Sequence, residues 1–105
     1  MKAEQLGAVR DQRHLLDVRE DEEWVAGHIA GSQHIPLGQL EARLDEVPRD
    51  RTVVTVCRSG HRSGIAAKGL AARGITAENL EGGVIDWARV GQPLITPAGD
   101  RGRVL

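Results

Sequence analysis

The residues best suited to chemistry lie in one short stretch, residues 52–64, which reads TVVTVCRSGHRSG. An apolar run ends at Cys57, the only cysteine in the 105-residue chain, and arginine, serine, glycine and histidine follow it. A helix amino terminus and neighbouring cations lower a cysteine pKa from ~8.5 to roughly 3.5–7.5. We therefore expect Cys57 to be an exposed nucleophile that is largely ionised at neutral pH.

The residues after Cys57 supply groups that stabilise a thiolate. Gly60 allows a tight turn that brings backbone amides close to the sulfur. Arg58 and Arg62 can form paired hydrogen bonds to an oxyanion. An inert buried cysteine is the alternative, but the polar neighbours of an inert core thiol would each need bonding partners of their own.

Three further polar residues complete the stretch. Ser59 and Ser63 are candidates to donate hydrogen bonds to the thiolate, and Ser63 is equally suited to cap the following helix. His61 is a candidate proton carrier. We favour a role for His61 in lining the loop, because a preformed thiolate needs no general base.

Short apolar runs that lack strict polar alternation predict strands covered on both faces. The best are residues 14–18 and 52–56, and weaker candidates lie at 33–37 and 77–82. Strands that alternate with helical patterns predict an α/β fold, with a parallel sheet of about four to five strands and helices on both faces. Ligands of such sheets bind beyond the carboxyl ends of the strands, which is where Cys57 lies.

Three helical patterns separate or follow these runs. Apolar residues at positions 37, 40, 44 and 47 predict an amphipathic helix that follows Pro36 and closes at Pro48. Residues 62–73 are rich in alanine and precede a glycine stop. Residues 82–91 are expected to form a third helix with Trp87 on its buried side.

Composition narrows the classes of partner. The chain has 14 lysines and arginines and 15 aspartates and glutamates, so it has no excess of positive charge to bind nucleic acid. One cysteine cannot form an internal disulfide, and no run reaches the roughly 18 apolar residues of a membrane span. The histidines show no metal-site spacing. We expect a soluble cytoplasmic chain without metal or cofactor, unless it is a piece of a longer protein.

Four blocks together resemble a known family. They are LLDVRE at 15–20, GHIAGSQHIP at 27–36, VCRSGHRS at 56–63 and LEGGVIDW at 80–87. In this order and spacing the chain resembles a single-domain rhodanese over nearly its whole length. The resemblance implies a single rhodanese-like domain, catalysis by Cys57, and substrate binding by the loop residues Arg58, Ser59, Gly60, His61, Arg62 and Ser63. The family usually has a short strand before its first helix, for which only Met1 and Lys2 are available here.

The resemblance implies a sulfurtransferase of the thiosulfate sulfurtransferase type. Cys57 would take sulfane sulfur from a donor such as thiosulfate, hold it as a persulfide and pass it to a second nucleophile in ping-pong order. Cyanide, a small thiol or a protein thiol would be the acceptor.

Two alternatives belong to other classes. One is a noncatalytic rhodanese-like interaction or regulatory domain. The other is an arsenate reductase or phosphatase, but the cysteine loops of that class are longer by one residue than the four residues between Cys57 and Arg62.

The remaining features are expected to be structural. Asp17 and Arg19, at the end of the first strand, are expected to form an ion pair that supports the loop. The acidic run at 20–23 is typical of a solvated helix face, and Trp24 is expected in packing. Proline and glycine at 93–105 predict a mobile C-terminal extension of a domain that spans 1–92.

Overall fold

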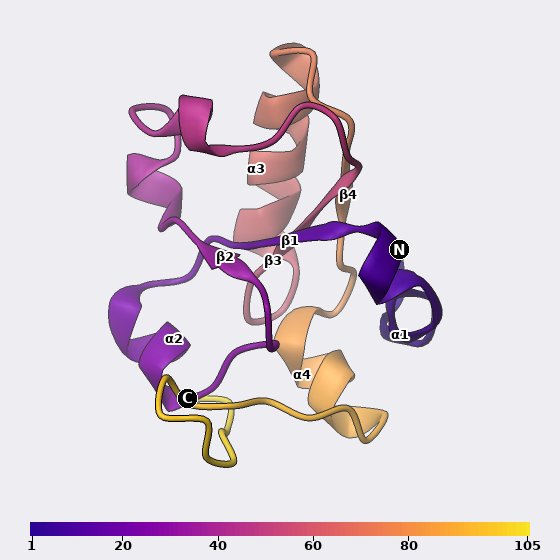
Figure 1. The fold of residues 1–105 in the computed structure, drawn as a ribbon, viewed down its shortest axis with the longest axis vertical. Helices are drawn as coiled ribbons and strands as arrows, with labels where there is room; N and C mark the ends of the chain where they lie inside the picture. The colour runs from indigo at the N-terminus through magenta and orange to yellow at the C-terminus, as the bar shows by residue number, and fades with distance from the viewer.

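Four short parallel strands form the sheet, and their spatial order is β2-β1-β3-β4. The computed structural model describes residues 1–105. The strands are β1 (His14–Asp17), β2 (Gln33–His34), β3 (Val53–Val56) and β4 (Ala77–Asn79). β3 is wholly buried, which agrees with its apolar sequence. The sheet confirms the predicted α/β fold at the lower end of the expected strand number (Figure 1).

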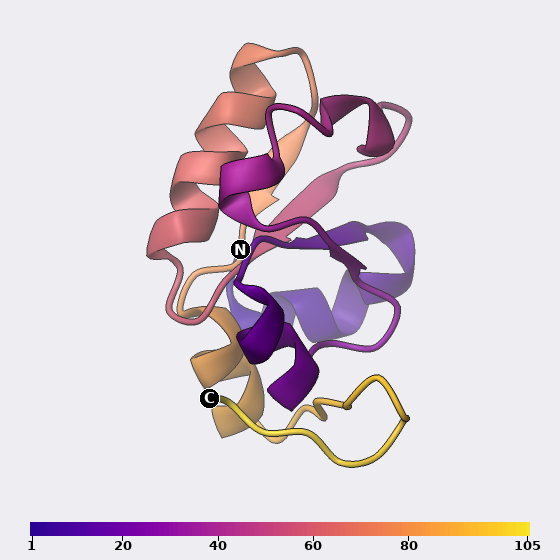
Figure 2. The same ribbon diagram turned by 90° about the vertical axis from the view of Figure 1, so that its left-hand side faces the viewer.

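Helices cover both faces of the sheet, as predicted. They are α1 (Ala3–Val9), α2 (Asp21–Ala26), α3 (His61–Ala72) and α4 (Gly83–Arg89). α1 and α3 lie on opposite sides of the sheet (Figure 2). Neighbouring strand residues point to opposite faces, so Leu15 packs with α1 and α4 while Leu16 packs with α3. Trp87 of α4 is fully buried, as expected.

The segment between Pro36 and Pro48 corrects one prediction. It contains two 3-10 turns, η2 (Leu37–Gln39) and η3 (Leu44–Glu46), and not one amphipathic helix. The span between the prolines is shorter than an isolated helix needs, and a glycine near its start disfavours helix nucleation. Leu40 and Val47 are still buried in the core. The apolar spacing therefore predicted which residues are buried, but not the type of helix.

The strand that usually precedes the first helix in this family is represented in this structure by a single residue. The amino group of Met1 donates to Asn79 O at 2.9 Å, and Glu81 N donates to Met1 O at 2.8 Å. This is the bonding pattern of one residue added in parallel beside the end of β4. α1 begins two residues later, at Ala3.

The C-terminal residues 93–105 rest against the end of α2. Ile95 and His28 exchange two backbone hydrogen bonds of 2.9 Å, and Arg103 N donates to Ala26 O at 2.9 Å. Leu94 is buried in the core. That this extension is mobile stays a prediction. If it moves, it must break the hydrogen bonds of Ile95 and Arg103 and withdraw Leu94 from the core. No helix in the chain is long and apolar enough to cross a membrane.

Close packing of Gly102 predicts how the extension can be released. A Cβ at this position would lie 2.6 Å from Gly27 Cα and 3.0 Å from Ala26 O. We expect Gly102→Ala to increase hydrogen exchange at the Arg103 amide severalfold, measured by NMR. Gly38→Ala is the control, because a Cβ there meets nothing within 4 Å. Equal exchange in Gly102→Ala and in the native chain would contradict this account of the docking.

Candidate functional site

Cys57 lies directly after β3, and its sulfur faces the loop that leads into α3. The residue is only 1 % exposed and belongs to the same core cluster as Val18 and Ala66. The expectation of an exposed sulfur was therefore wrong, because α3 and the end of β1 close over the thiol. The sulfur is nevertheless turned toward hydrogen-bond donors: Gly60 N donates to Sγ at 3.1 Å and Ser63 Oγ lies 3.2 Å from Sγ.

The surroundings of Sγ favour its ionised form. Burial is the largest single influence and raises the pKa of Cys57. Hydrogen bonds from the Ser63 hydroxyl and from the backbone amides of Ser63, Gly60 and Ser59 together outweigh it. The pKa of Cys57 is therefore lowered below its ordinary value, which is the predicted direction.

The loop amides point inward because the loop carbonyls are engaged outside. Val84 N donates to Cys57 O at 2.9 Å, and Ile85 N donates to Arg58 O at 3.2 Å. Both donors belong to the first turn of α4, whose amides have no partner inside the helix. Gly60 turns the chain into α3 with a φ of +104°, a conformation that favours glycine. Two helix beginnings thus frame the sulfur.

Ser63 connects the sulfur to a residue that sequence reasoning missed. The buried Ser63 Oγ lies 2.5 Å from Asn79 Oδ1, and Asn79 Nδ2 donates to Gly60 O at 3.0 Å. The N-cap of α3 is Gly60, so the capping role considered for Ser63 was wrong. Asn79 is the last residue of β4, the strand beside β3. A polar residue at the carboxyl end of a parallel strand could have indicated that Asn79 belongs to the site.

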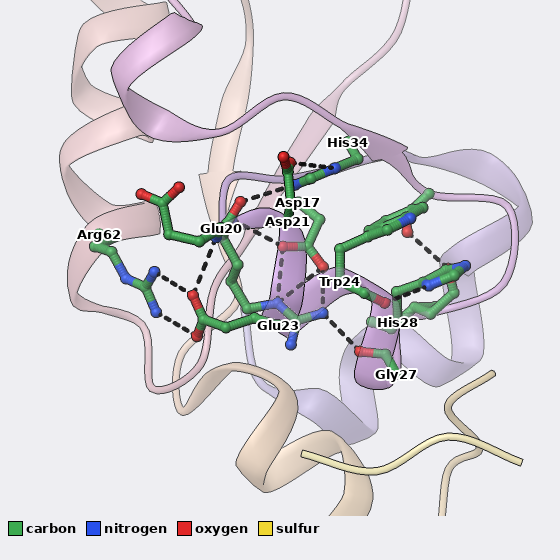
Figure 3. A network of polar contacts seen from close by, with 12 residues as sticks. Asp17, Glu20, Asp21, Glu23, Trp24, Gly27, His28, His34 and Arg62 are labelled. Atoms are coloured by element: carbon green, nitrogen blue, oxygen red, sulfur yellow. Dashed lines mark hydrogen bonds and ion pairs between the residues drawn. The ribbon is translucent and has the colours of Figure 1, made fainter. Parts of the chain in front are cut away.

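Arg62 is held by an acidic residue of α2. Its Nη1 lies 2.7 Å from Glu23 Oε1 and its Nη2 lies 2.9 Å from Glu23 Oε2 (Figure 3). Glu23 is only 15 % exposed at its side chain, so the acidic run is not wholly a solvated face. The hydrogen bond from Arg62 is the main reason that the pKa of Glu23 is lowered to about 2, with burial opposing it.

Asp17 and Arg19 form the predicted ion pair, and it is fully buried. Arg19 Nη2 lies 2.7 Å from Asp17 Oδ2 and donates to Gly27 O at 2.8 Å. Asp17 pairs in register with Val56, the residue before Cys57. The pair therefore joins the ends of β1 and α2 next to the start of the loop.

The other predicted loop residues lie at the surface or bind other partners. Ser59 and His61 are exposed, and Ser59 contributes its amide. Arg58 is also exposed, and its Nε donates to Leu105 O at 3.1 Å. The structure thus gathers Cys57, Gly60 and Ser63, while both arginines have partners elsewhere.

Trp24 packs between two histidines, which fits the structural role expected for it. Its ring centroid lies 3.6 Å from that of His28 and 4.7 Å from that of His34, with all three rings nearly parallel (Figure 3). His34 Nε2 is 2.8 Å from Arg19 O. The stack fixes α2 against β2, and α2 carries Glu23 toward Arg62.

Comparison with known proteins agrees with this geometry. The family model for the rhodanese-like domain matches residues 2–90. The chain therefore belongs to the rhodanese-like family.

Three individual relatives illustrate the likeness. The chain is 41% identical over 86 residues to a sulfurtransferase of Allochromatium vinosum, covering 81% of this chain and 80% of that protein. It is 38% identical over 77 residues to the putative sulfurtransferase YtwF of Bacillus subtilis, covering 73% and 75%. The crystal structure of a rhodanese-related protein from Thermoplasma volcanium superposes with a TM-score of 0.88 at 32% identity, covering 90% of this chain and 95% of that one.

The contact between α4 and the loop predicts a strong effect at Gly83. A Cβ there would lie 2.4 Å from both Cys57 O and Arg58 O, and the residue has a φ of +57°. We expect Gly83→Ala to lower the free energy of unfolding by about 3 kcal/mol or more, measured by urea denaturation. Gly91→Ala is the matched control, since Gly91 has a φ of +86° but open space around it. Equal losses in both variants would contradict the proposed contact.

The Glu23–Arg62 pair predicts a pH-dependent stability. The pKa of Glu23 is depressed from 4.5 to about 2 in the folded chain, so its stabilisation is complete above pH 4.5 and is lost as the pH falls toward 2. The difference in unfolding free energy between the native chain and Glu23→Gln should shrink over that window. Urea denaturation at a series of pH values measures it.

Glu41→Gln serves as the control for this series. Glu41 pairs with Arg73 at 3.1 Å but its side chain is 85% exposed. Exposed ion pairs contribute little to stability. The free energy of unfolding of Glu41→Gln should therefore stay within about 0.5 kcal/mol of the native value at each pH. A native-to-Glu23→Gln difference that stays constant down to low pH would show that the ionisation of Glu23 does not contribute to the stability of the fold.

Proposed function

We propose that the chain is a sulfurtransferase of the thiosulfate sulfurtransferase type, with Cys57 as the sulfur carrier. The observation that carries the proposal is the sulfur's setting: Sγ accepts hydrogen bonds from Gly60 N and the Ser63 hydroxyl, and its pKa is lowered. Sulfurtransferases among the relatives support the same class of reaction.

The reaction follows from the thiolate at Cys57. Its sulfur attacks the outer sulfur of a donor such as thiosulfate, a new S–S bond forms, and the donor's own S–S bond breaks. Sulfite leaves with the electron pair of that bond, and the outer sulfur of the Cys57 persulfide carries the negative charge. An acceptor nucleophile then attacks this outer sulfur and regenerates the thiolate.

The loop is suited to hold one sulfur atom and its charge. Backbone amides at the start of α3 and the partial positive end of this 12-residue helix stabilise an anion there. We propose that the exposed Arg58 and the Glu23-bound Arg62 attract the anionic part of the donor at the mouth of the loop, while Ser59, Gly60, His61 and Ser63 line it. Asp17 and Arg19 support the loop from β1.

The acceptor is proposed as cyanide, a small thiol or a protein thiol, all of which are thiophilic. A cytoplasmic setting is part of the proposal, because a lone nucleophilic thiol survives best under reducing conditions. The four residues between Cys57 and Arg62 form a smaller ring than a tetrahedral oxyanion needs, which favours sulfur transfer over phosphatase or arsenate reductase chemistry. A rhodanese-like interaction domain has no need of a stabilised thiolate.

Mass spectrometry of the intact protein after incubation with thiosulfate tests the proposal. We expect the native chain to gain one sulfur atom and Cys57→Ser to gain none. Addition of cyanide should remove the extra sulfur and yield thiocyanate. Failure of the native chain to gain sulfur from any sulfane donor would point to an interaction domain, and turnover of an aryl phosphate or arsenate would point to oxyanion chemistry.

A further inference from the structure

Ser63 has two hydrogen-bond acceptors but only one hydroxyl proton. Its Oγ lies 3.2 Å from Cys57 Sγ and 2.5 Å from Asn79 Oδ1. A serine hydroxyl can donate to only one of two such acceptors at a time. Ser63 is fully buried and Asn79 is half-buried, and the acceptor that the hydroxyl does not serve loses this donor. The two acceptors therefore compete for this proton.

The orientation of the Asn79 amide makes it an acceptor toward Ser63. Its Nδ2 donates to Gly60 O at 3.0 Å, and Gly60 O also accepts from Gly64 N at 3.1 Å. Turning the amide around would place Oδ1 against the Gly60 carbonyl, two acceptors with no proton between them. The bond to Gly60 thus fixes which end of Asn79 faces Ser63.

We propose that Asn79 is a positioning residue for sulfur transfer, which acts by competing with Cys57 Sγ for the single hydroxyl proton of Ser63. The proposal rests on the sulfurtransferase function of Cys57. No step is assigned to Asn79 itself, which reaches the sulfur only through Ser63.

The competition changes with the state of the sulfur. In the thiol, Cys57 S–H can donate to Ser63 Oγ while the Ser63 hydroxyl donates to Asn79 Oδ1, and every group is satisfied. In the thiolate, the Ser63 hydroxyl must turn to Sγ, and Asn79 Oδ1 loses its donor. In the persulfide the charge lies on the outer sulfur beside the loop amides, so the hydroxyl is free to return to Asn79. Asn79 thus favours the thiol and the loaded persulfide over the empty thiolate.

The elements around the loop also carry titratable groups, of which Arg62 interacts with the charge of Cys57. They are Asp17 on β1, Arg19 just after β1, Glu23 on α2, Arg58 in the loop, His61 and Arg62 on α3, Glu78 on β4 and Asp86 on α4. These side chains are the same in all the variants compared below, so we assign differences between variants at Asn79 and Ser63 to the shared proton.

The test is the pH titration of Cys57, followed by the ultraviolet absorbance of its thiolate, in four chains: native, Ser63→Ala, Asn79→Ala and the double variant. We expect Ser63→Ala to raise the pKa of Cys57 by about 1 unit, since a donor to the thiolate is lost. Asn79→Ala should lower it by about half a unit, because the hydroxyl is released to the sulfur. The double variant should match Ser63→Ala.

A merely structural role for Asn79 predicts the opposite result. Loss of its bond to Gly60 O would loosen the loop and weaken the Gly60 amide's bond to Sγ, which would raise the pKa of Cys57. A raised or unchanged value in Asn79→Ala, or a further change on top of Ser63→Ala, would overturn the proposal. Asn79→Asp keeps an acceptor beside Ser63 and should raise the pKa of Cys57. The same substitution made in Ser63→Ala measures the effect of the added negative charge alone, because no shared proton is present there.

The titration needs no sulfur donor, so its outcome is separate from that of the sulfurtransferase proposal. Circular dichroism of each variant reports whether the fold is kept. The persulfide yield at equal thiosulfate concentration is a second readout. Asn79→Ala should carry less sulfur than the native chain, because in this variant Asn79 no longer disfavours the empty thiolate relative to the persulfide. If the native chain gains no sulfur, the proposed function is rejected, while the titration still decides whether Asn79 and Cys57 compete for the Ser63 proton.

Discussion

The site depends on the hydrogen bonds between the Cys57 loop and the first turn of α4. By accepting from Val84 N and Ile85 N, the carbonyls of Cys57 and Arg58 are turned away from the sulfur. The Gly60 amide and the Ser63 hydroxyl then face Sγ from the other side. Without these outer bonds the loop carbonyls would be free to turn toward Sγ, where their negative oxygens would oppose a thiolate.

Two ion pairs hold the surroundings of this loop. The buried Asp17–Arg19 pair ties β1 to the end of α2, and the Glu23–Arg62 pair ties α2 to the first turn of α3. A buried pair such as Asp17–Arg19 contributes modestly to net stability, but breaking it leaves an uncompensated buried charge. Their effect here is to fix the relative positions of three elements that converge on one buried sulfur.

Much of this arrangement was predictable from short-range patterns. The apolar run of β3, the alanine-rich α3 and the block around Trp87 each predicted its element, because burial and helix propensity act over a few residues. The turns between Pro36 and Pro48 were not predicted, since apolar spacing alone cannot separate a helix from successive 3-10 turns. The burial of Cys57 also went unpredicted, as it depends on side chains of β1 and α3.

The sequence by itself determined the identity of the nucleophile, the loop that follows it and the family to which the chain belongs, because these reside in contiguous residue types. Only the tertiary structure decided that Asn79 meets Ser63 and that Arg62 meets Glu23. These partners are 16 and 39 residues apart along the chain. Such contacts arise where parallel strands end side by side and helices close over them, and no local pattern specifies which side chains meet there.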